Sequence, residues 1–187
     1  MNIDMLSLSG HKIYAPKGVG ALYVKKEIEF EKFIDGGHQE KDKRAGTENV
    51  AGIVALGKAC EIAEKNLEKY QKKLRSLRDY FLERIKKEIP NIHINGTMDN
   101  RLPGNINISF PGIESSELLF KLDSFGICAS GGSACSSVNN NPSHVLTAIG
   151  LPSALSKSAI RFTFGDFNKK DDVDYLIKAL NKNAKWT

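Results

Sequence analysis

Two short motifs of this 187-residue chain carry side chains that could do chemistry. The first, Ser-Gly-His-Lys at residues 9–12, places a primary amine next to an imidazole and three residues after a hydroxyl. The second, Ser-Ala-Cys-Ser at residues 133–136, places a thiol in a loop of small residues. A lysine amine can bind a carbonyl group covalently, and a cysteine thiolate is a nucleophile. Together the motifs supply an amine, on Lys12, that can hold a carbonyl cofactor and a nucleophile, on Cys135, that can take up sulfur.

The three cysteines are expected to differ in role. Cys135 lies in a stretch of glycine, alanine and serine at residues 129–137, which permits movement and close approach to a ligand. For Cys60 and Cys128 we expect the ordinary role of small buried hydrophobic side chains. An odd number of cysteines without a Cys-x-x-Cys pair predicts neither a disulfide framework nor a closed zinc site, and it fits a reducing cytoplasm.

Arg161 stands in a strand-like run of apolar and hydroxyl residues at 159–164. A charge in such surroundings is costly unless it is paired. A guanidinium binds a carboxylate through two parallel hydrogen bonds. The partner of Arg161 is therefore either the carboxylate of a ligand or a protein carboxylate in a structural ion pair, and the residues alone leave both open.

The composition bounds the class of protein. Hydrophobic residues make up 41% and charged residues 26% of the chain, with a net charge of +5, which predicts an ordinary globular protein of one domain, or one domain and a piece of another. The basic residues are interspersed with acidic ones and no nucleic-acid-binding motif accompanies them, so we expect no direct nucleic-acid partner. No run of about 18 apolar residues predicts a membrane span, and no signal-peptide pattern is seen.

Hydrophobic periodicity predicts a long helix flanked by shorter elements. The helix covers residues 49–88, because apolar side chains recur three and four apart from Ile53 to Phe81. At about 60 Å it is longer than a small domain is wide, so it bridges two lobes or bends; a coiled coil is the competing interpretation. The other predicted elements are strands at 3–9, 21–24, 92–94, 106–110, 127–129 and 159–164, and helices at 114–125, 144–150 and 170–182.

Taken together, the motifs resemble those of the cysteine desulfurases, pyridoxal-phosphate enzymes of the class V aminotransferase group. The resemblance rests on residues 9–12, 16–20, 44–49, 133–136, 142–146 and 160–162, in family order along nearly the whole chain. It implies a mixed α+β and α/β fold, the C-terminal part of a fold type I transferase dependent on pyridoxal phosphate. Residues 1–50 would be the last strands of the large cofactor-binding domain, 51–90 a long linking helix, and 91–187 a small α+β domain.

The resemblance also implies a cofactor site. Lys12 would form the Schiff base with pyridoxal 5′-phosphate and later shuttle a proton. Ser9 and His11 would bind the cofactor phosphate. Thr47 would contribute to the phosphate site of the neighbouring subunit in a homodimer.

The implied reaction takes sulfur from L-cysteine. Arg161 would bind the substrate α-carboxylate, and Cys135 would accept the sulfur as a persulfide while L-alanine is released. The sulfur would pass to an acceptor or iron–sulfur scaffold protein, for cluster assembly or tRNA thiolation. No metal site is expected, although the sequence leaves open a transient iron–sulfur contact at Cys135.

Family members carry roughly as much sequence again upstream, including the aspartate that pairs with the cofactor ring. The chain is therefore expected to be the C-terminal half of such an enzyme, inactive without the other half. Two alternatives stay open at this point: a non-catalytic sulfur-relay or scaffold module that keeps the Cys135 loop, and an enzyme of the selenocysteine lyase type.

Overall fold

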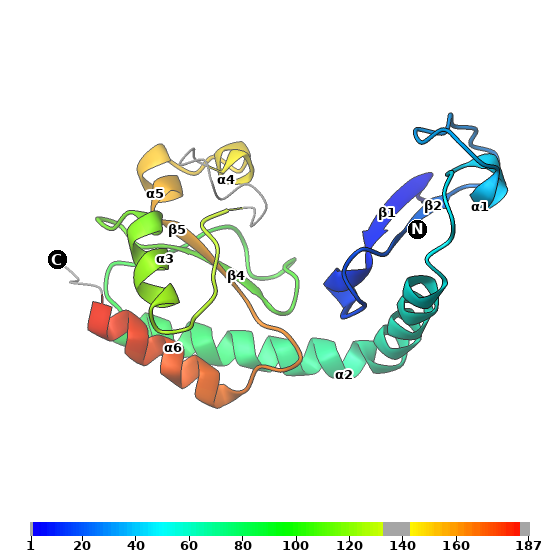
Figure 1. The fold of residues 1–187 in the computed structure, drawn as a ribbon. Helices are drawn as coiled ribbons and strands as arrows, with labels where there is room; N and C mark the ends of the chain where they lie inside the picture. The colour runs from blue at the N-terminus through cyan, green and yellow to red at the C-terminus, as the bar shows by residue number, and fades with distance from the viewer. Residues whose placement is uncertain (1, 133–142, 184–187) are drawn as a thin grey trace. The chain divides into compact units, whose positions relative to one another are not determined.

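The computed structural model describes residues 2–132 and 143–183 (Figure 1). The chain forms two compact units, Met1–Leu67 and Glu68–Thr187. The boundary between them falls inside one long helix, α2 (Val50–Glu88). The division at residues 50 and 90 expected from the sequence stays a prediction about functional domains.

The first unit is built on a two-stranded antiparallel ribbon. Strand β1 (Met5–Ser9) pairs with β2 (Gly20–Val24), in a register that runs from Met5 opposite Val24 to Ser9 opposite Gly20. Large apolar side chains are exposed on both faces: Leu6 and its partner Tyr23 are 52% and 54% exposed on one face, and Met5 and Leu22 are exposed on the other. The ribbon therefore has no face that is fully covered by the described residues.

Among the described residues, a single small apolar cluster holds this ribbon to the first turns of α2. The turn after β1 and the start of α2 meet in it, so the helix fixes the position of the chain that follows β1. Its members are the buried Ala15, Leu56 and Ala59 and the partly buried Leu8, Ile13 and Val19.

The predicted helix at 49–88 is confirmed as α2. Asn49 caps it, because its Oδ1 accepts the backbone N–H of Gly52 at 3.1 Å, one of the donors that a helix start leaves without an intrahelical partner. The predicted apolar stripe is buried in two parts, at Leu56 and from Leu77 onward. Between them Leu67 is 54% exposed, so the periodicity that predicts the helix does not predict continuous burial.

The second unit is an antiparallel sheet with one apolar face. The strand order is β3 (His93–Ile94), β4 (Asn105–Ser109), β5 (Ala159–Thr163). Ile106 pairs with Phe162 and Ile108 with Ile160, and all four are buried, while the alternate residues lie on the opposite face. Helices α3 (Ser115–Asp123) and α6 (Lys170–Asn183), together with the C-terminal half of α2, supply the rest of this core (Figure 1).

Two short helices complete the described structure, α4 (His144–Ala148) and α5 (Ser153–Lys157), together with a 3-10 turn, η1 (Gly10–Ile13), and a left-handed turn, α1 (Gln39–Asp42). The sequence predicted α4 but not α1, α5 or η1, since four- or five-residue elements are too short for periodicity to reveal. Across the described residues, no helix combines the length and hydropathy needed to cross a bilayer.

The strand expected at 127–129 is wrong. After α3 the chain turns back on itself, because the N–H of Ile127 donates to the carbonyl of Leu122. That bond closes the end of the helix and leaves the segment outside the ladder. Only Ser130 reaches the sheet, as a single antiparallel bridge to Arg161.

The burial expected for two cysteines is also wrong, since Cys60 and Cys128 are both exposed. Cys60 follows the buried Ala59 on α2, and one step along a helix turns a side chain by about 100° away from its neighbour. Cys128 lies between two partly buried residues, Ile127 and Ala129, and points to the other side of the chain.

A polar cluster joins α2 to α6 in the second unit. The Tyr80 hydroxyl donates to Asp174 Oδ1 at 2.6 Å, and Arg84 donates to Tyr80, Asp174 and Glu88. The hydrogen bond from Tyr80, reinforced by Arg84, lowers the pKa of Asp174, and the hydrogen bond from Arg84 lowers the pKa of Glu88. At the start of α6 the N–H of Lys169 lowers the pKa of Asp172 in the same way.

These three lowered pKa values predict loss of stability in acid. A carboxylate whose pKa is lower in the folded state stabilises that state above its unfolded pKa, and the contribution disappears as the pH falls through the folded pKa. We expect the urea midpoint of unfolding to be steady from pH 7 to about 5 and to fall below about pH 4. Asp174→Asn should flatten this fall, whereas Asp99→Asn, at an exposed turn, should not. Equal pH profiles for the wild type and Asp174→Asn would contradict the assignment.

The cap of α2 gives a second prediction. Asn49→Ala removes the oxygen that accepts the Gly52 N–H and should lower the free energy of unfolding by about 1 kcal/mol, while Asn49→Asp keeps the acceptor and should not. The matched control is Asn66→Ala, because the Asn66 amide only donates back to the Ile62 carbonyl within the helix. Alanine is the better helix former there, so the control should be neutral or stabilising. Urea unfolding followed by circular dichroism measures all three variants.

Candidate functional site

The turn that carries Lys12 is fixed by its backbone. Ser9 ends β1, and His11 and Lys12 lie in η1, which follows at once. The N–H of Gly10 donates to the carbonyl of Val19 at 2.9 Å. Gly10 is buried, and a Cβ there would stand 2.9 Å from the same carbonyl oxygen, so only glycine lets the turn pack this closely.

The side chains on this turn are available for a ligand. Ser9, His11 and Lys12 are all exposed, and within the described residues none of their side chains makes a hydrogen bond or an ion pair. A hydroxyl and an imidazole suit a phosphate group, and a primary amine suits a carbonyl carbon. The donor set on this turn therefore fits pyridoxal phosphate, the cofactor implied by the sequence motifs.

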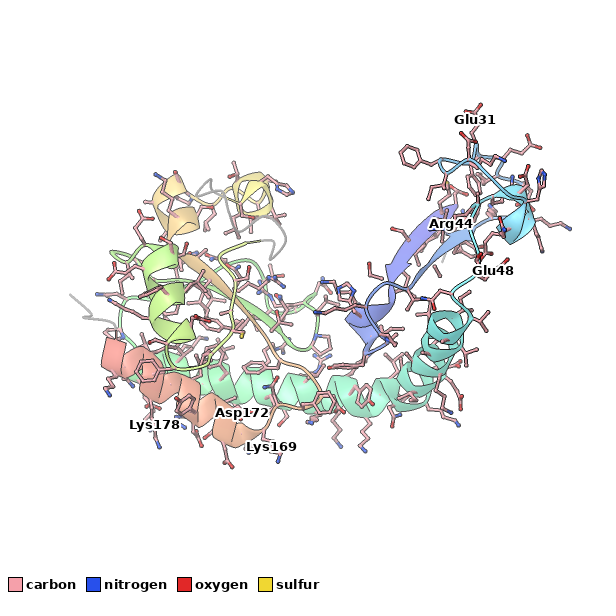
Figure 2. The ribbon with its side chains drawn as sticks, viewed as in Figure 1. Glu31, Arg44, Glu48, Lys169, Asp172 and Lys178 are labelled. Carbon is pink, nitrogen blue, oxygen red and sulfur yellow. The ribbon has the colours of Figure 1, made fainter. Side chains whose placement is uncertain are left out.

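Thr47 lies elsewhere in the first unit. It is exposed in the segment between α1 and α2, which also carries Arg44 and Glu48 (Figure 2). It lines an open pocket of about 1040 Å³ whose charged lining is mainly basic: Lys25, Lys26, Lys41, Lys43 and Arg44 against Glu31, Glu40 and Glu48. Ser9, His11 and Lys12 do not line this pocket, so the pocket of Thr47 and the turn of Lys12 are separate features.

The backbone that precedes Thr47 has a conformation that no pattern in the sequence predicts. Glu40, Lys41 and Asp42 all have positive φ, between 51° and 62°, a conformation that side-chain-bearing residues rarely adopt. Asp42 Oδ1 accepts a hydrogen bond from Lys32 Nζ at 2.9 Å and lies 3.1 Å from His38 Nδ1. These two contacts, that of Lys32 first, lower the pKa of Asp42. Both contacts connect the last residue of the left-handed turn to residues that precede the turn.

Arg161 lies on the face of the second unit's sheet opposite the core. Its strand partner is Asn107, and directly paired residues of antiparallel strands share a face. The half-buried guanidinium makes two long contacts, from Nε to the Gly132 carbonyl at 3.3 Å and from Nη1 to Thr163 Oγ1 at 3.4 Å. No carboxylate of the described residues lies within ion-pair distance of it. Within this part of the chain, the structural ion pair that the sequence left open is therefore not formed.

A buried polar network that includes Asn107, the strand partner of Arg161, was not predicted from the sequence. Asn95 is 1% exposed and donates through Nδ2 to Asn107 Oδ1 at 2.6 Å and to Ser109 Oγ at 2.8 Å. Ser109 in turn donates to the Leu155 carbonyl at 2.7 Å. The network ties the chain after β3 and the middle of α5 to the polar face of β4. Asparagine and serine are common in loops, so the sequence offered no signal that these two are buried.

The sulfur-accepting residue expected from the sequence, Cys135, lies outside the described residues, as does the rest of its motif at 133–136. Its loop begins inside them, at Ser130, Gly131 and Gly132, next to Arg161.

Comparison with known proteins places these features in a family. Residues 1–176 match the aminotransferase class V family. The chain is 48% identical over 182 residues to a protein named cysteine desulfurase IscS from Dictyoglomus turgidum, a match that covers 97% of this chain and 46% of that protein. A NifS-like protein from Rickettsia africae superposes with a TM-score of 0.86 at 31% identity, over 96% of this chain and 47% of that one.

A third relative is a solved structure described as SspA in complex with cysteine. It is 34% identical with a TM-score of 0.60, over 90% of this chain and 46% of that one. This chain thus spans about half the length of the relatives that it matches. Because the family match extends over nearly all of its residues, the chain belongs to the aminotransferase class V family.

Proposed function

We propose that this chain is the C-terminal portion of a cysteine desulfurase that uses pyridoxal 5′-phosphate. The protein would remove sulfur from L-cysteine, release L-alanine and hold the sulfur as a persulfide on Cys135. The observation that carries the proposal is the 48% identity to a cysteine desulfurase along 97% of the chain. The exposed amine of Lys12 supports it, and so does the guanidinium of Arg161, which forms no ion pair with a carboxylate of the described residues.

The roles of the first unit follow from its donor set. The Lys12 amine would hold the cofactor, and the Ser9 hydroxyl and His11 imidazole would bind its phosphate. Thr47, which lies on a separate basic pocket, would contribute to the phosphate site of a second subunit in a homodimer. When bound, pyridoxal phosphate withdraws electrons from the α-carbon of an amino acid. The Lys12 amine would then take up and return the α-proton.

The roles of the second unit concern the substrate. Arg161 would bind the α-carboxylate of L-cysteine through its two Nη groups. The Cys135 thiolate would form a bond to the substrate sulfur as the carbon–sulfur bond breaks, and the electron pair left on carbon would be protonated to give L-alanine. The persulfide would then pass to a sulfur acceptor or an iron–sulfur scaffold protein.

The proposal is tested by assaying sulfide and L-alanine from L-cysteine with the holoenzyme that contains this chain. Lys12→Ala and Cys135→Ser should each lower turnover by at least about 100-fold, since each removes a group that handles the proton or the sulfur. Cys128→Ser is the matched control, because Cys128 is exposed and lies seven residues away in the sequence. Sulfide release by Cys135→Ser at the wild-type rate would overturn the role of Cys135.

Arg161 gives an independent prediction. Arg161→Ala should raise KM for L-cysteine by about 10- to 100-fold, because a hydrogen-bonded charge is lost from the bound substrate. Arg161→Lys should restore only part of the affinity, since an ammonium cannot form the two parallel bonds. Arg75→Ala removes an exposed arginine of α2 and should leave KM unchanged. An unchanged KM in Arg161→Ala would mean that the carboxylate binds elsewhere.

A further inference from the structure

We infer that Ser130 is a positioning residue for Arg161: its hydroxyl sets the place of the Gly132 carbonyl, and that carbonyl orients the guanidinium toward the substrate carboxylate. This inference rests on the proposed function for the identity of the ligand. The positioning itself follows from contacts within the second unit.

The first contact is between backbones. The N–H of Arg161 donates to the carbonyl of Ser130 at 2.6 Å, and the N–H of Ser130 donates to the carbonyl of Arg161 at 3.3 Å. Two residues that each donate the backbone N–H to the carbonyl of the other form a hydrogen-bonded antiparallel pair. Their side chains lie on the same face of the sheet. Ser130 therefore stands directly beside Arg161, on the polar face of β5.

The second contact is made by the serine side chain. Ser130 is only 9% exposed, and its Oγ donates to the Gly132 carbonyl at 2.9 Å and accepts the Gly132 N–H at 3.4 Å. The hydroxyl thus closes a tight turn over two residues. Without it, the Gly132 carbonyl would keep only the longer contact from Arg161 Nε among the side chains of the described residues.

The same carbonyl reaches the arginine. Arg161 Nε lies 3.3 Å from the Gly132 oxygen, so this oxygen faces both the Ser130 hydroxyl and the guanidinium. The Nε–H of the guanidinium is therefore already hydrogen-bonded within the protein. Nη1 reaches only Thr163, at 3.4 Å, and Nη2 has no partner among the described residues. The edge formed by the two Nη groups is the one left for a carboxylate.

The turn at residues 130–132 also packs against helix α3. Gly131 lies against α3, where a Cβ added to it would stand 3.2 Å from Ser115 Oγ and 3.5 Å from Leu119 Cδ1. This spacing leaves the turn little room to shift toward the helix. Ser130 accordingly acts through Gly132 on a guanidinium that is held at Nε by the Gly132 carbonyl and at Nη1 by Thr163.

The test distinguishes a role of Ser130 in positioning Arg161 from a role in the stability of the fold. In the holoenzyme, Ser130→Ala should raise KM for L-cysteine about three- to tenfold, the range expected from one hydrogen bond, with kcat changed less than about twofold. Ser130→Thr keeps the hydroxyl and should restore KM. The matched control is Ser124→Ala, which removes a similar bond, from Ser124 Oγ to the Lys121 carbonyl at 2.7 Å, at the end of α3. If Ser130→Ala does not fold, the comparison of Ser130→Thr with Ser130→Val takes its place.

A second measurement does not depend on catalysis. The exchange of the Arg161 Nε–H with water, followed by NMR and assigned with Arg161→Lys, should become several-fold faster in Ser130→Ala and stay unchanged in Ser124→Ala. Unchanged exchange in Ser130→Ala would overturn the inference. An unchanged KM in Ser130→Ala would also overturn it where Arg161→Ala raises KM, and so would equal losses of kcat and kcat/KM. If exchange responds to Ser130 but Arg161→Ala leaves KM unchanged, the positioning stands and the proposed role of Arg161 in substrate binding fails.

Discussion

The two-residue alternation of β4 and β5 is the constraint on which the second unit depends. The core closes only when four alternate residues of these strands face the helices: Ile106, Ile108, Ile160 and Phe162. The residues between them must then lie on the opposite face of the sheet. Arg161 is thereby held on the opposite face, beside Asn107, in a strand that cannot slip by one residue without inverting every side chain. A hydrophobic core thus determines where a charged group is presented.

The first unit is organised by close backbone approach instead. Its apolar cluster is small, and the turn that carries Lys12 owes its shape to Gly10 packed against Val19. Gly20 plays a related part in the ribbon, because a Cβ there would stand 2.6 Å from the Leu8 carbonyl oxygen. The position of the Lys12 amine therefore depends on glycines, which have no side chain and let the backbone pack closely. The position of the Arg161 guanidinium in the second unit depends on densely packed side chains of the core.

How far the sequence predicts this structure depends on the kind of signal. Long periodic elements such as α2 and the alternating β4 and β5 are predictable, since many side chains repeat one preference. The failed strand at 127–129 shows the limit: its residues favour a strand, but the hydrogen bond from Ile127 to Leu122 closes the helix end first. The sequence singled out Lys12 and Arg161 as candidates, and their roles stay predictions. The contact between the Ser130 hydroxyl and the Gly132 carbonyl could not be predicted, because it depends on which carbonyl a serine faces in three dimensions.

The exposed ribbon of the first unit has a consequence for handling the polypeptide. Among the described residues, β1 and β2 pair only with each other, so each offers a row of free backbone donors and acceptors along its outer side. With Leu6, Leu22 and Tyr23 open to water, such a row is a template for adding further strands from other copies. Dilute, cool preparation and a solubilising fusion partner are the practical measures that this surface calls for.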